Sequence, residues 1–360
     1  MFNPSRLTLA RQRRGLTKTK LAAEAQLTVR SVSAYEAGDM VPSDATIAEL
    51  SRILRFPAEF FSANSLDVPS TESASFRALS SMTAGQRDSA LGAGALAIEL
   101  AEWVDARFNL PAPTLPDLRG HTPEAAADAV RGGWGLGERP VKNMVHLLEA
   151  RGVRVFSLVE ECKEVDVFSL WRGGTPYIFL NTIKSAERGR FDAGHELGHL
   201  LLHRHGAPQG REAEHEADAF ASAFLMPRGS VLANAPRLPS LDHLVKLKRN
   251  WNVSVAALAH RMHALNLMSD WHYRTICIEI AQRGYKRSEP NGIPRETSQL
   301  LQKVFQALRD EGMTKPAIAK HLHVDATELD SLVFGLVMTP MQGGRTSPEP
   351  RRGRGQLRVV

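Results

Sequence analysis

The spacing of hydrophobic residues divides the chain into helical ends and a central stretch in which helices and strands alternate. Residues 1–62 form short helical segments separated by Gly and Pro, and they end in an amphipathic run at 45–61. A Ser/Thr/Asn-rich linker opens residues 63–120, which continue in a helix at 81–108 and close in a Pro-rich break. The pattern is helical again from 240 to 340. We therefore expect a mostly helical protein.

The central stretch adds strands to this pattern. Thr122 is placed to cap an Ala-rich helix that has Pro123 at its first position, and further helices are predicted at 141–150, 187–203 and 212–225. Runs rich in β-branched and aromatic residues predict three strands, at Val153–Leu158, Val165–Trp171 and Pro176–Asn181. The expected fold class is α+β, mostly helical, with a small three-stranded sheet in the central domain.

A repeat links the two helical ends of the chain. Residues 17–38 and 314–335 align without gaps and have the same helix–turn–helix hydrophobic spacing. In the first copy, Thr17 and Thr28 are placed to cap two successive helices, and Gly38 closes the second. Val32 and Tyr35 share the buried face of that second helix.

The exposed side of the second helix carries the residues that are expected to meet DNA. A recognition helix presents its N-terminal residues to base edges in the major groove. The candidates for these contacts are Thr28, Val29, Arg30, Ser31 and Ser33, and Arg30 can grip a guanine through two hydrogen bonds. Lys18 and Lys20 on the preceding helix are expected to hold phosphates.

The second copy carries acids at the corresponding outer positions. Asp325, Glu328 and Asp330 stand where the first copy has Thr28, Ser31 and Ser33. Acids there would repel a phosphate backbone. We therefore expect the second copy to serve in packing or dimerisation, without binding DNA.

The segment Leu7–Phe61 resembles the Xre/Cro family of DNA-binding domains. The resemblance rests on the helix spacing, on the Tyr-Glu-x-Gly exit from the second helix, and on Pro42 after it. It implies a five-helix domain that dimerises on a palindromic double-stranded DNA operator.

Charge and composition indicate where the protein is located and that nucleic acid is a partner. The net charge is +6, and residues 1–30 hold seven Arg and Lys residues against one acid, Glu24. Such a concentration attracts a phosphate backbone, although it also fits a solvated helix face. The two cysteines lie far apart, and no signal peptide or membrane span is recognisable. We expect a cytoplasmic, nucleoid-associated protein with no membrane partner.

A metal site is predicted on the helix at 187–203, which contains the sequence HELGH. His195 and His199 lie one helical turn apart, so both imidazoles can reach one ion. Glu196 then lies beside the water that the metal activates and can take its proton. His203 lies a further turn away, which favours a supporting role outside the ligand set.

The third ligand is expected on the following helix, in the sequence EAEHEADAF. Glu214 is the preferred ligand, and Asp218, one turn later on the same face, is the acceptor that would orient a ligand histidine. The rivals Glu212, His215 and Glu216 face other directions on the helix. Zn²⁺, or another divalent ion, is the expected cofactor.

The stretch Val153–Pro227 resembles the ImmA/IrrE metallopeptidase family. The matching pieces, in order, are YIFLN, the lead-in Arg188–Phe191, HELGHLLLH, and the elements Glu214–Ala221 and Leu225–Pro227. The resemblance implies a zincin-like domain that cleaves Xre-type repressors during stress, DNA damage or prophage induction. It also implies a substrate extended along an edge strand, for which the run at 176–181 is the candidate.

These observations define five regions. They are a helix-turn-helix domain at 1–62, a linker and helix at 63–120, a metallopeptidase domain at 121–285, a helical, helix-turn-helix-like element at 286–340, and a disordered basic tail at 341–360. The expected function is a homodimeric DNA-binding regulator with a zinc endopeptidase domain that cleaves a repressor in trans or itself. The alternatives are a transcription factor without proteolysis or an antitoxin-like regulator, in which the zincin fold senses a signal or grips a partner.

Overall fold

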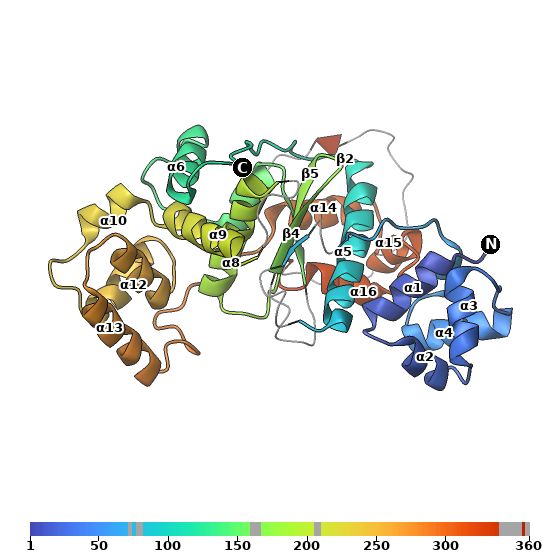
Figure 1. Ribbon diagram of the computed structural model, residues 1–360. Helices are drawn as coiled ribbons and strands as arrows, with labels where there is room; N and C mark the ends of the chain where they lie inside the picture. The colour runs from blue at the N-terminus through green and yellow to red at the C-terminus, as the bar shows by residue number, and fades with distance from the viewer. Residues whose placement is uncertain (71–73, 77–81, 159–166, 205–209, 338–354, 357–360) are drawn as a thin grey trace. The chain divides into compact units, whose positions relative to one another are not determined.

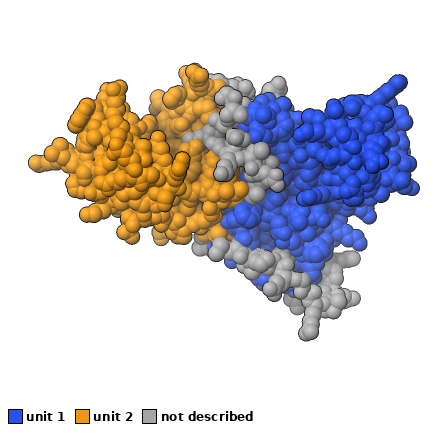
Figure 2. Space-filling view, turned by 90° about the horizontal axis from the view of Figure 1, so that it is seen from below, with its two compact units in different colours: residues 1–111, 156–166, 299–360 blue, residues 112–155, 167–298 orange. Residues whose placement is uncertain are grey.

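The computed structural model describes residues 1–70, 74–76, 82–158, 167–204, 210–337 and 355–356. The chain folds into two compact units, shown in different colours in Figure 2. Unit 1 comprises residues 1–111, 156–166 and 299–360, and unit 2 comprises residues 112–155 and 167–298. Unit 1 thus contains both ends of the chain, and unit 2 is formed from the residues between them.

Unit 1 is helical and begins with the predicted helix-turn-helix. Thr17 and Thr28 cap α2 and α3 as predicted, and Gly38 ends α3 in the left-handed conformation. The expected fifth helix of this domain is a short 3-10 segment, η1. The elements of unit 1 are α1 (Pro4–Arg13), α2 (Lys18–Glu24), α3 (Val29–Ala37), α4 (Asp44–Leu54), η1 (Ala58–Ser62), β1 (Ala74–Phe76), α5 (Ala84–Asp105), β2 (Phe108–Asn109), α14 (Gln299–Asp310), α15 (Lys315–His321), α16 (Ala326–Val333) and β6 (Gly355–Gln356).

The predicted repeat is confirmed, and it includes one more helix than the sequence indicated. Helices α14, α15 and α16 follow α1, α2 and α3 at a constant offset of 297 positions (17 to 314). The turn after the second helix holds a left-handed residue in both copies, Gln26 with φ 54° and His323 with φ 51°. The turn before it holds a left-handed glycine in both, Gly15 and Gly312. The two copies therefore share their backbone conformation as well as their hydrophobic pattern.

The second copy packs on the first through a buried ion-pair cluster. The Glu328 carboxylate of α16 is 3% exposed and accepts hydrogen bonds from Arg13 Nε at 2.6 Å and Arg14 Nη1 at 2.8 Å. Burial by itself raises the pKa of Glu328, but the two guanidinium groups outweigh that effect and hold its pKa below the usual value. Helix α5 also joins α1, where Ser89 Oγ donates to the Arg13 carbonyl at 2.8 Å. The predicted packing role of the second copy is confirmed.

The predicted tail at 341–360 lies outside the described residues, except for Gly355–Gln356. These two residues form β6, which pairs in parallel with β2.

Unit 2 combines helices with the predicted three-stranded sheet (Figure 1). Thr122 and Pro123 begin α6 as predicted. The elements of unit 2 are α6 (Pro123–Gly133), α7 (Met144–Ala150), β3 (Arg154–Ser157, of which residues 154–155 belong to this unit), β4 (Val167–Arg172), β5 (Thr175–Leu180), α8 (Ala186–Leu202), α9 (Arg211–Leu225), α10 (Arg228–Asn234), α11 (Leu241–Leu247), η2 (Lys248–Asn250), α12 (Val255–Ala264) and α13 (Asp270–Gln282). No helix in the described part of the chain is long and apolar enough to span a bilayer.

The sheet corrects one prediction. β4 and β5 are antiparallel, with Val167 opposite Leu180 and Arg172 opposite Thr175, and β5 lies between β4 and β3 in the strand order. The run at 176–181 is therefore an inner strand, paired on both sides, and it cannot accept an extended peptide at an open edge. The sequence pattern could not reveal this because pairing order depends on the path of the chain between strands.

Helix α8 lies against the sheet, and α9 crosses α8 at very short range. Trp171 of β4 donates its indole N–H to the Leu200 carbonyl at 3.0 Å. A Cβ added to Gly198 would lie 3.1 Å from Phe220 Cδ1 and 3.2 Å from Ala217 Cα, closer than ordinary van der Waals contact. The absence of a side chain at position 198 thus lets α9 approach α8 closely without displacing Phe220 or Ala217.

The segment between α13 and α14 is fixed to unit 2 by charged side chains. Glu296 accepts from the Met144 backbone N–H at 2.8 Å, at the beginning of α7, and pairs with buried Arg190 of α8. Buried Lys248 lies 3.4 Å from Glu187 at the beginning of α8. The first turns of α8 are therefore held by ion pairs, and its second half carries the predicted metal ligands.

Candidate metal centre and DNA-binding surface

Three predicted metal ligands meet where α8 and α9 cross. His195 Nε2 lies 3.1 Å from His199 Nε2 and 3.4 Å from Glu214 Oε2, and His199 Nε2 lies 3.3 Å from Glu214 Oε1. Both imidazoles are buried, whereas the Glu214 side chain is 30% exposed. Among the described residues, this is the group of acids, histidines and cysteines that could hold a metal ion.

The distances between these donor atoms fit a zinc ion. In a tetrahedral site with bonds of about 2.0–2.1 Å, neighbouring donor atoms lie about 3.3–3.4 Å apart. The three observed separations, 3.1, 3.3 and 3.4 Å, are close to that spacing. Two imidazoles and one carboxylate also form the ligand set of many hydrolytic zinc sites. The residues present therefore fit a zinc ion or a similar divalent cation.

The protonation states of the ligands suit the same ion. Burial lowers the pKa of His199 to about 4, so its ring is neutral at pH 7. Burial by itself raises the pKa of Glu214, but its contacts with His195 and His199 outweigh it and lower this pKa to about 2. A neutral imidazole and an ionised carboxylate are the forms that bind metals.

The outer nitrogens of the two imidazoles are also hydrogen-bonded. His195 Nδ1 lies 2.8 Å from Asp218 Oδ1, and His199 Nδ1 lies 2.8 Å from His203 Nδ1. The structure thus places Asp218 and His203 directly behind the two histidines. His203 Nε2, in turn, lies at 2.8 Å from the Oε2 atom of Glu216. The sequence interpretation missed this contact because Glu216 points away from Glu214. The sequence signal that could have found this contact is that a buried histidine, such as His203 behind His199, needs a hydrogen-bond partner for its second ring nitrogen.

Glu196, the predicted general base, is fully buried on α8 beside His195. Ser169 of β4 donates its hydroxyl to the Glu196 carbonyl at 3.4 Å, which ties this turn of α8 to the sheet. The position of Glu196 along the helix is therefore fixed relative to the ligands on the same turn.

The predicted DNA-contacting residues lie at the N-terminal end of α3 and on α2. Thr28, Val29 and Arg30 are exposed, and Ser31 and Ser33 are half-buried. The Thr28 hydroxyl accepts from the Ser31 backbone N–H at 3.0 Å, so it caps the helix. Exposed Arg30 is thus placed at the beginning of α3, where a recognition helix meets base edges.

The two predicted phosphate-binding lysines differ from each other. Lys20 is exposed. Lys18 Nζ lies 3.3 Å from Glu36 Oε2, and Glu36 also pairs with Arg11 at 2.6 Å. Lys20 is therefore the better placed of the two for a phosphate contact.

Most of the basic side chains near the N-terminus form internal ion pairs. Arg6 pairs with Glu99 at 2.8 Å, Arg11 with Glu36, and Arg13 and Arg14 with Glu328. Their acidic partners come mostly from distant parts of the chain, so a count of charges in residues 1–30 overstates the charge available to DNA. Lys20 and Arg30 are the exposed basic residues of this segment.

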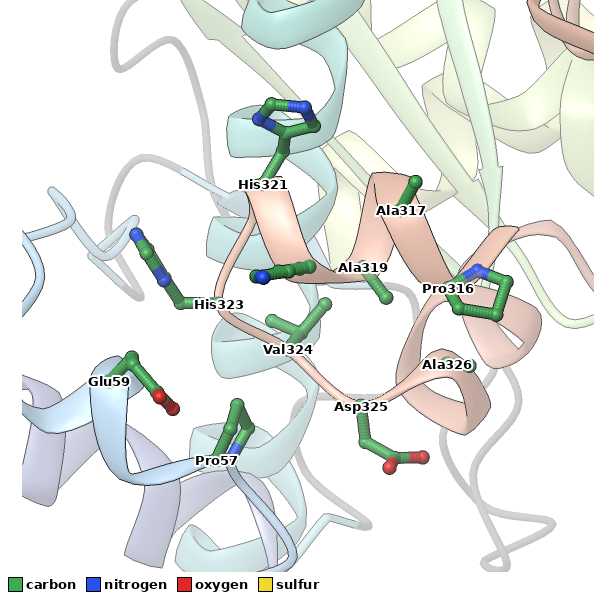
Figure 3. A pocket seen from close by; sticks show the side chains of 11 residues that line it. Pro57, Glu59, Pro316, Ala317, Ala319, His321, His323, Val324, Asp325 and Ala326 are labelled. Carbon is green, nitrogen blue, oxygen red and sulfur yellow. The ribbon is translucent and has the colours of Figure 1, made fainter. Parts of the chain in front are cut away.

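A groove of about 820 Å³ lies in unit 1 beside the contact between the two helix-turn-helix copies (Figure 3). Pro57 and Glu59, beside and within η1 of the N-terminal domain, line it from one side, and His321, His323 and Val324 line it from the second copy. None of the three clustered metal-ligand residues lines it. The copies therefore touch through Glu328 and leave an open groove next to that contact.

Two family models match the chain. Residues 7–61 match the helix-turn-helix family, and residues 148–263 match a peptidase family described as the IrrE N-terminal-like domain. No curated protein matches the chain. The chain therefore joins a helix-turn-helix DNA-binding domain to a metallopeptidase-type domain, in the order that the sequence motifs predicted, and the peptidase family implies a metal.

Proposed function

With these two domains on one chain, we propose that the protein is a transcriptional regulator that cleaves a regulatory protein at a zinc centre formed by His195, His199 and Glu214. The observation that carries the proposal is the meeting of these three side chains at tetrahedral spacing on the matched peptidase domain. The favoured substrate is an Xre-type repressor, in agreement with the family resemblance and with the chain's own helix-turn-helix. The zinc ion would supply the Lewis acidity that makes water nucleophilic near neutral pH.

The residues of the chain have separate roles in this proposal. Glu196 takes a proton from the attacking water and passes it to the leaving amine. Asp218 holds the imidazole of His195, and His203 holds that of His199, so that both Nε2 atoms face Glu214. Close packing at Gly198 and Ala217 keeps Glu214 within reach of the two histidines.

The test of proteolysis uses purified, zinc-loaded protein and an Xre-type repressor, with fragments identified by mass spectrometry. We expect the wild-type protein to cleave and Glu196→Gln, which retains all three ligands, to lose at least about a hundredfold in rate because the general base is absent. Equal fragment patterns from the two proteins would contradict the proposal.

The test of the metal site uses bound zinc after dialysis, measured by elemental analysis. Glu214→Gln should lose most of the zinc because a ligand is removed. Glu212→Gln is the matched control on the same helix, since Glu212 is exposed and outside the ligand cluster. Equal zinc contents in the two variants would remove Glu214 from the site.

A second function, regulation without proteolysis, is supported by the burial of the site. Glu196 and His195 are fully buried, and His199 is 4% exposed, so these three side chains present little surface to a peptide. A metal at such a site would stabilise unit 2 and serve as a sensor. In that case His195→Ala would lower the melting temperature and change operator affinity, and no repressor fragment would form with the wild-type protein.

For DNA binding, we propose that the protein binds a palindromic operator as a homodimer. It is supported by the helix-turn-helix match and by the exposed N-terminal residues of α3. Light scattering gives the mass in solution, and footprinting gives the operator symmetry. A monomer that protects a single half-site would contradict it.

A further inference from the structure

The two ligand histidines are supported from behind in different ways. His195 Nδ1 contacts a carboxylate directly, that of Asp218. His199 Nδ1 contacts a second imidazole, His203, and only the far nitrogen of that ring meets a carboxylate, Glu216 Oε2 at 2.8 Å. The His203 side chain is 6% exposed and the Glu216 side chain is 36% exposed, so the imidazole is shielded from water and the carboxylate is partly solvated.

The hydrogen atoms along this chain can be placed by following the donors and acceptors. A neutral imidazole carries one N–H and one acceptor nitrogen. If the Nε2 lone pair of His199 faces the metal, its Nδ1 carries the proton and donates to His203 Nδ1. His203 must then carry its own proton on Nε2, where it donates to the Glu216 carboxylate. Every donor meets an acceptor in this arrangement.

The carboxylate of Glu216 fixes the direction of donation in both hydrogen bonds, from His199 to His203 and from His203 to Glu216. An ionised carboxylate only accepts hydrogen bonds, so it requires an N–H on His203 Nε2. In a neutral His203, that requirement leaves Nδ1 as an acceptor, which in turn requires the proton of His199 on Nδ1. A carboxamide in place of Glu216 could donate as well as accept. It would permit the reverse arrangement, in which the proton of His199 lies on Nε2 and blocks metal binding.

We propose that Glu216, acting through His203, is a positioning residue that sets the tautomer of His199 for metal binding. The proposal rests on the metal site proposed above and adds a residue to it. Partners that fix the tautomer of a ligand histidine commonly contribute ten- to a hundredfold to metal affinity. Glu216→Gln should therefore weaken zinc binding by about that factor, although Glu216 contacts no ligand atom facing the metal.

The experiment measures zinc affinity by competition with a chelator, for the full-length protein and four variants. Glu216→Gln and His203→Phe should each weaken binding about ten- to a hundredfold, and the double variant should be no weaker than His203→Phe alone, since the two residues act in series. Glu212→Gln, on the same helix, should bind as the wild type does. Additive losses in the double variant, or wild-type affinity in Glu216→Gln, would overturn the proposal.

A second measurement separates this relay from a general effect on folding. In ¹⁵N-histidine-labelled protein, the nitrogen chemical shifts report which ring nitrogen of His203 carries the proton. We expect Nε2 in the wild type and a shift toward Nδ1 in Glu216→Gln. A proton on His203 Nδ1 in the wild type would overturn the proposal.

The outcomes also distinguish this inference from the proposed function. If the wild-type protein binds zinc and cleaves nothing, proteolysis fails as a function and the relay is still decided by the affinities. If the wild-type protein binds no zinc, the metal site fails, and the positioning role that rests on it fails with it.

Discussion

The two helix-turn-helix copies of unit 1 share a backbone and differ in the chemistry of one helix. Their helices, caps and left-handed turn residues correspond at a constant offset of 297 positions (17 to 314). On α3 the N-terminal positions carry Ser31 and Arg30, which suit a nucleic acid. At the corresponding positions of α16, Glu328 and Thr327 leave no basic group, and Glu328 binds two arginines instead. One scaffold thus carries side chains suited to DNA in one copy and to protein packing in the other.

Among substitutions that test the difference between the two copies, Glu328→Ala is expected to have the largest effect, a loss of stability. The substitution removes the Glu328 carboxylate that pairs with buried Arg13 and with Arg14. Breaking a buried ion pair by deleting one member typically costs about 3–5 kcal/mol, so the free energy of unfolding of unit 1 should fall by that order. Urea denaturation measures it. Asp330→Ala is the control on the same helix, and because Asp330 is mostly exposed it should change stability by less than about 1 kcal/mol.

A smaller effect, on DNA rather than on folding, is expected from Arg30→Ala. A side chain that grips a base through two hydrogen bonds contributes about 1–3 kcal/mol of discrimination, so operator affinity should fall by roughly that amount and specificity should relax. The counterpart in the second copy, Thr327→Ala, should leave affinity unchanged. Fluorescence anisotropy with operator and random DNA provides the comparison. Equal losses from both variants would mean that both copies touch DNA.

The smallest effect is a dependence of stability on pH that Glu328 should cause. Its pKa is lower in the folded than in the unfolded chain, so its contribution is fully present above the unfolded value of about 4.3. That contribution is lost as the pH falls through the folded value. The loss is smaller than for deletion because the protonated carboxyl still fills its place. Melting temperatures of the wild type and Glu328→Gln should therefore differ at pH 7 and converge in acid. A constant difference from pH 7 to pH 3 would contradict this.

Local features of the fold could be predicted from the sequence because they depend on neighbouring residues. The caps at Thr17, Thr28 and Thr122 use hydrogen bonds within one turn, so residue type and position suffice. The cluster of His195, His199 and Glu214 was also foreseeable, since helical spacing puts the two histidines on one face.

Features that depend on the path of the chain could not be predicted in this way. Arg13 and Glu328 lie 315 positions apart, and no local pattern pairs them. The inner position of β5 depends on where β3 lies in the sheet, which hydrophobic alternation does not encode. Glu216 was set aside because it faces away from Glu214, and its partner, His203, became apparent only when α8 and α9 were seen packed together.

The order of the chain through its two units has a consequence for any self-cleavage. Residues 1–111 and 299–337 belong to one unit, and the metal-ligand residues lie in the chain between them. A single nick within residues 167–298 would cut the polypeptide in two, yet both helix-turn-helix copies would stay joined by the Arg13, Arg14 and Glu328 contacts. Such a nick would be silent at the operator. We therefore expect proteolysis that switches off DNA binding to cut inside unit 1 or to act on another protein.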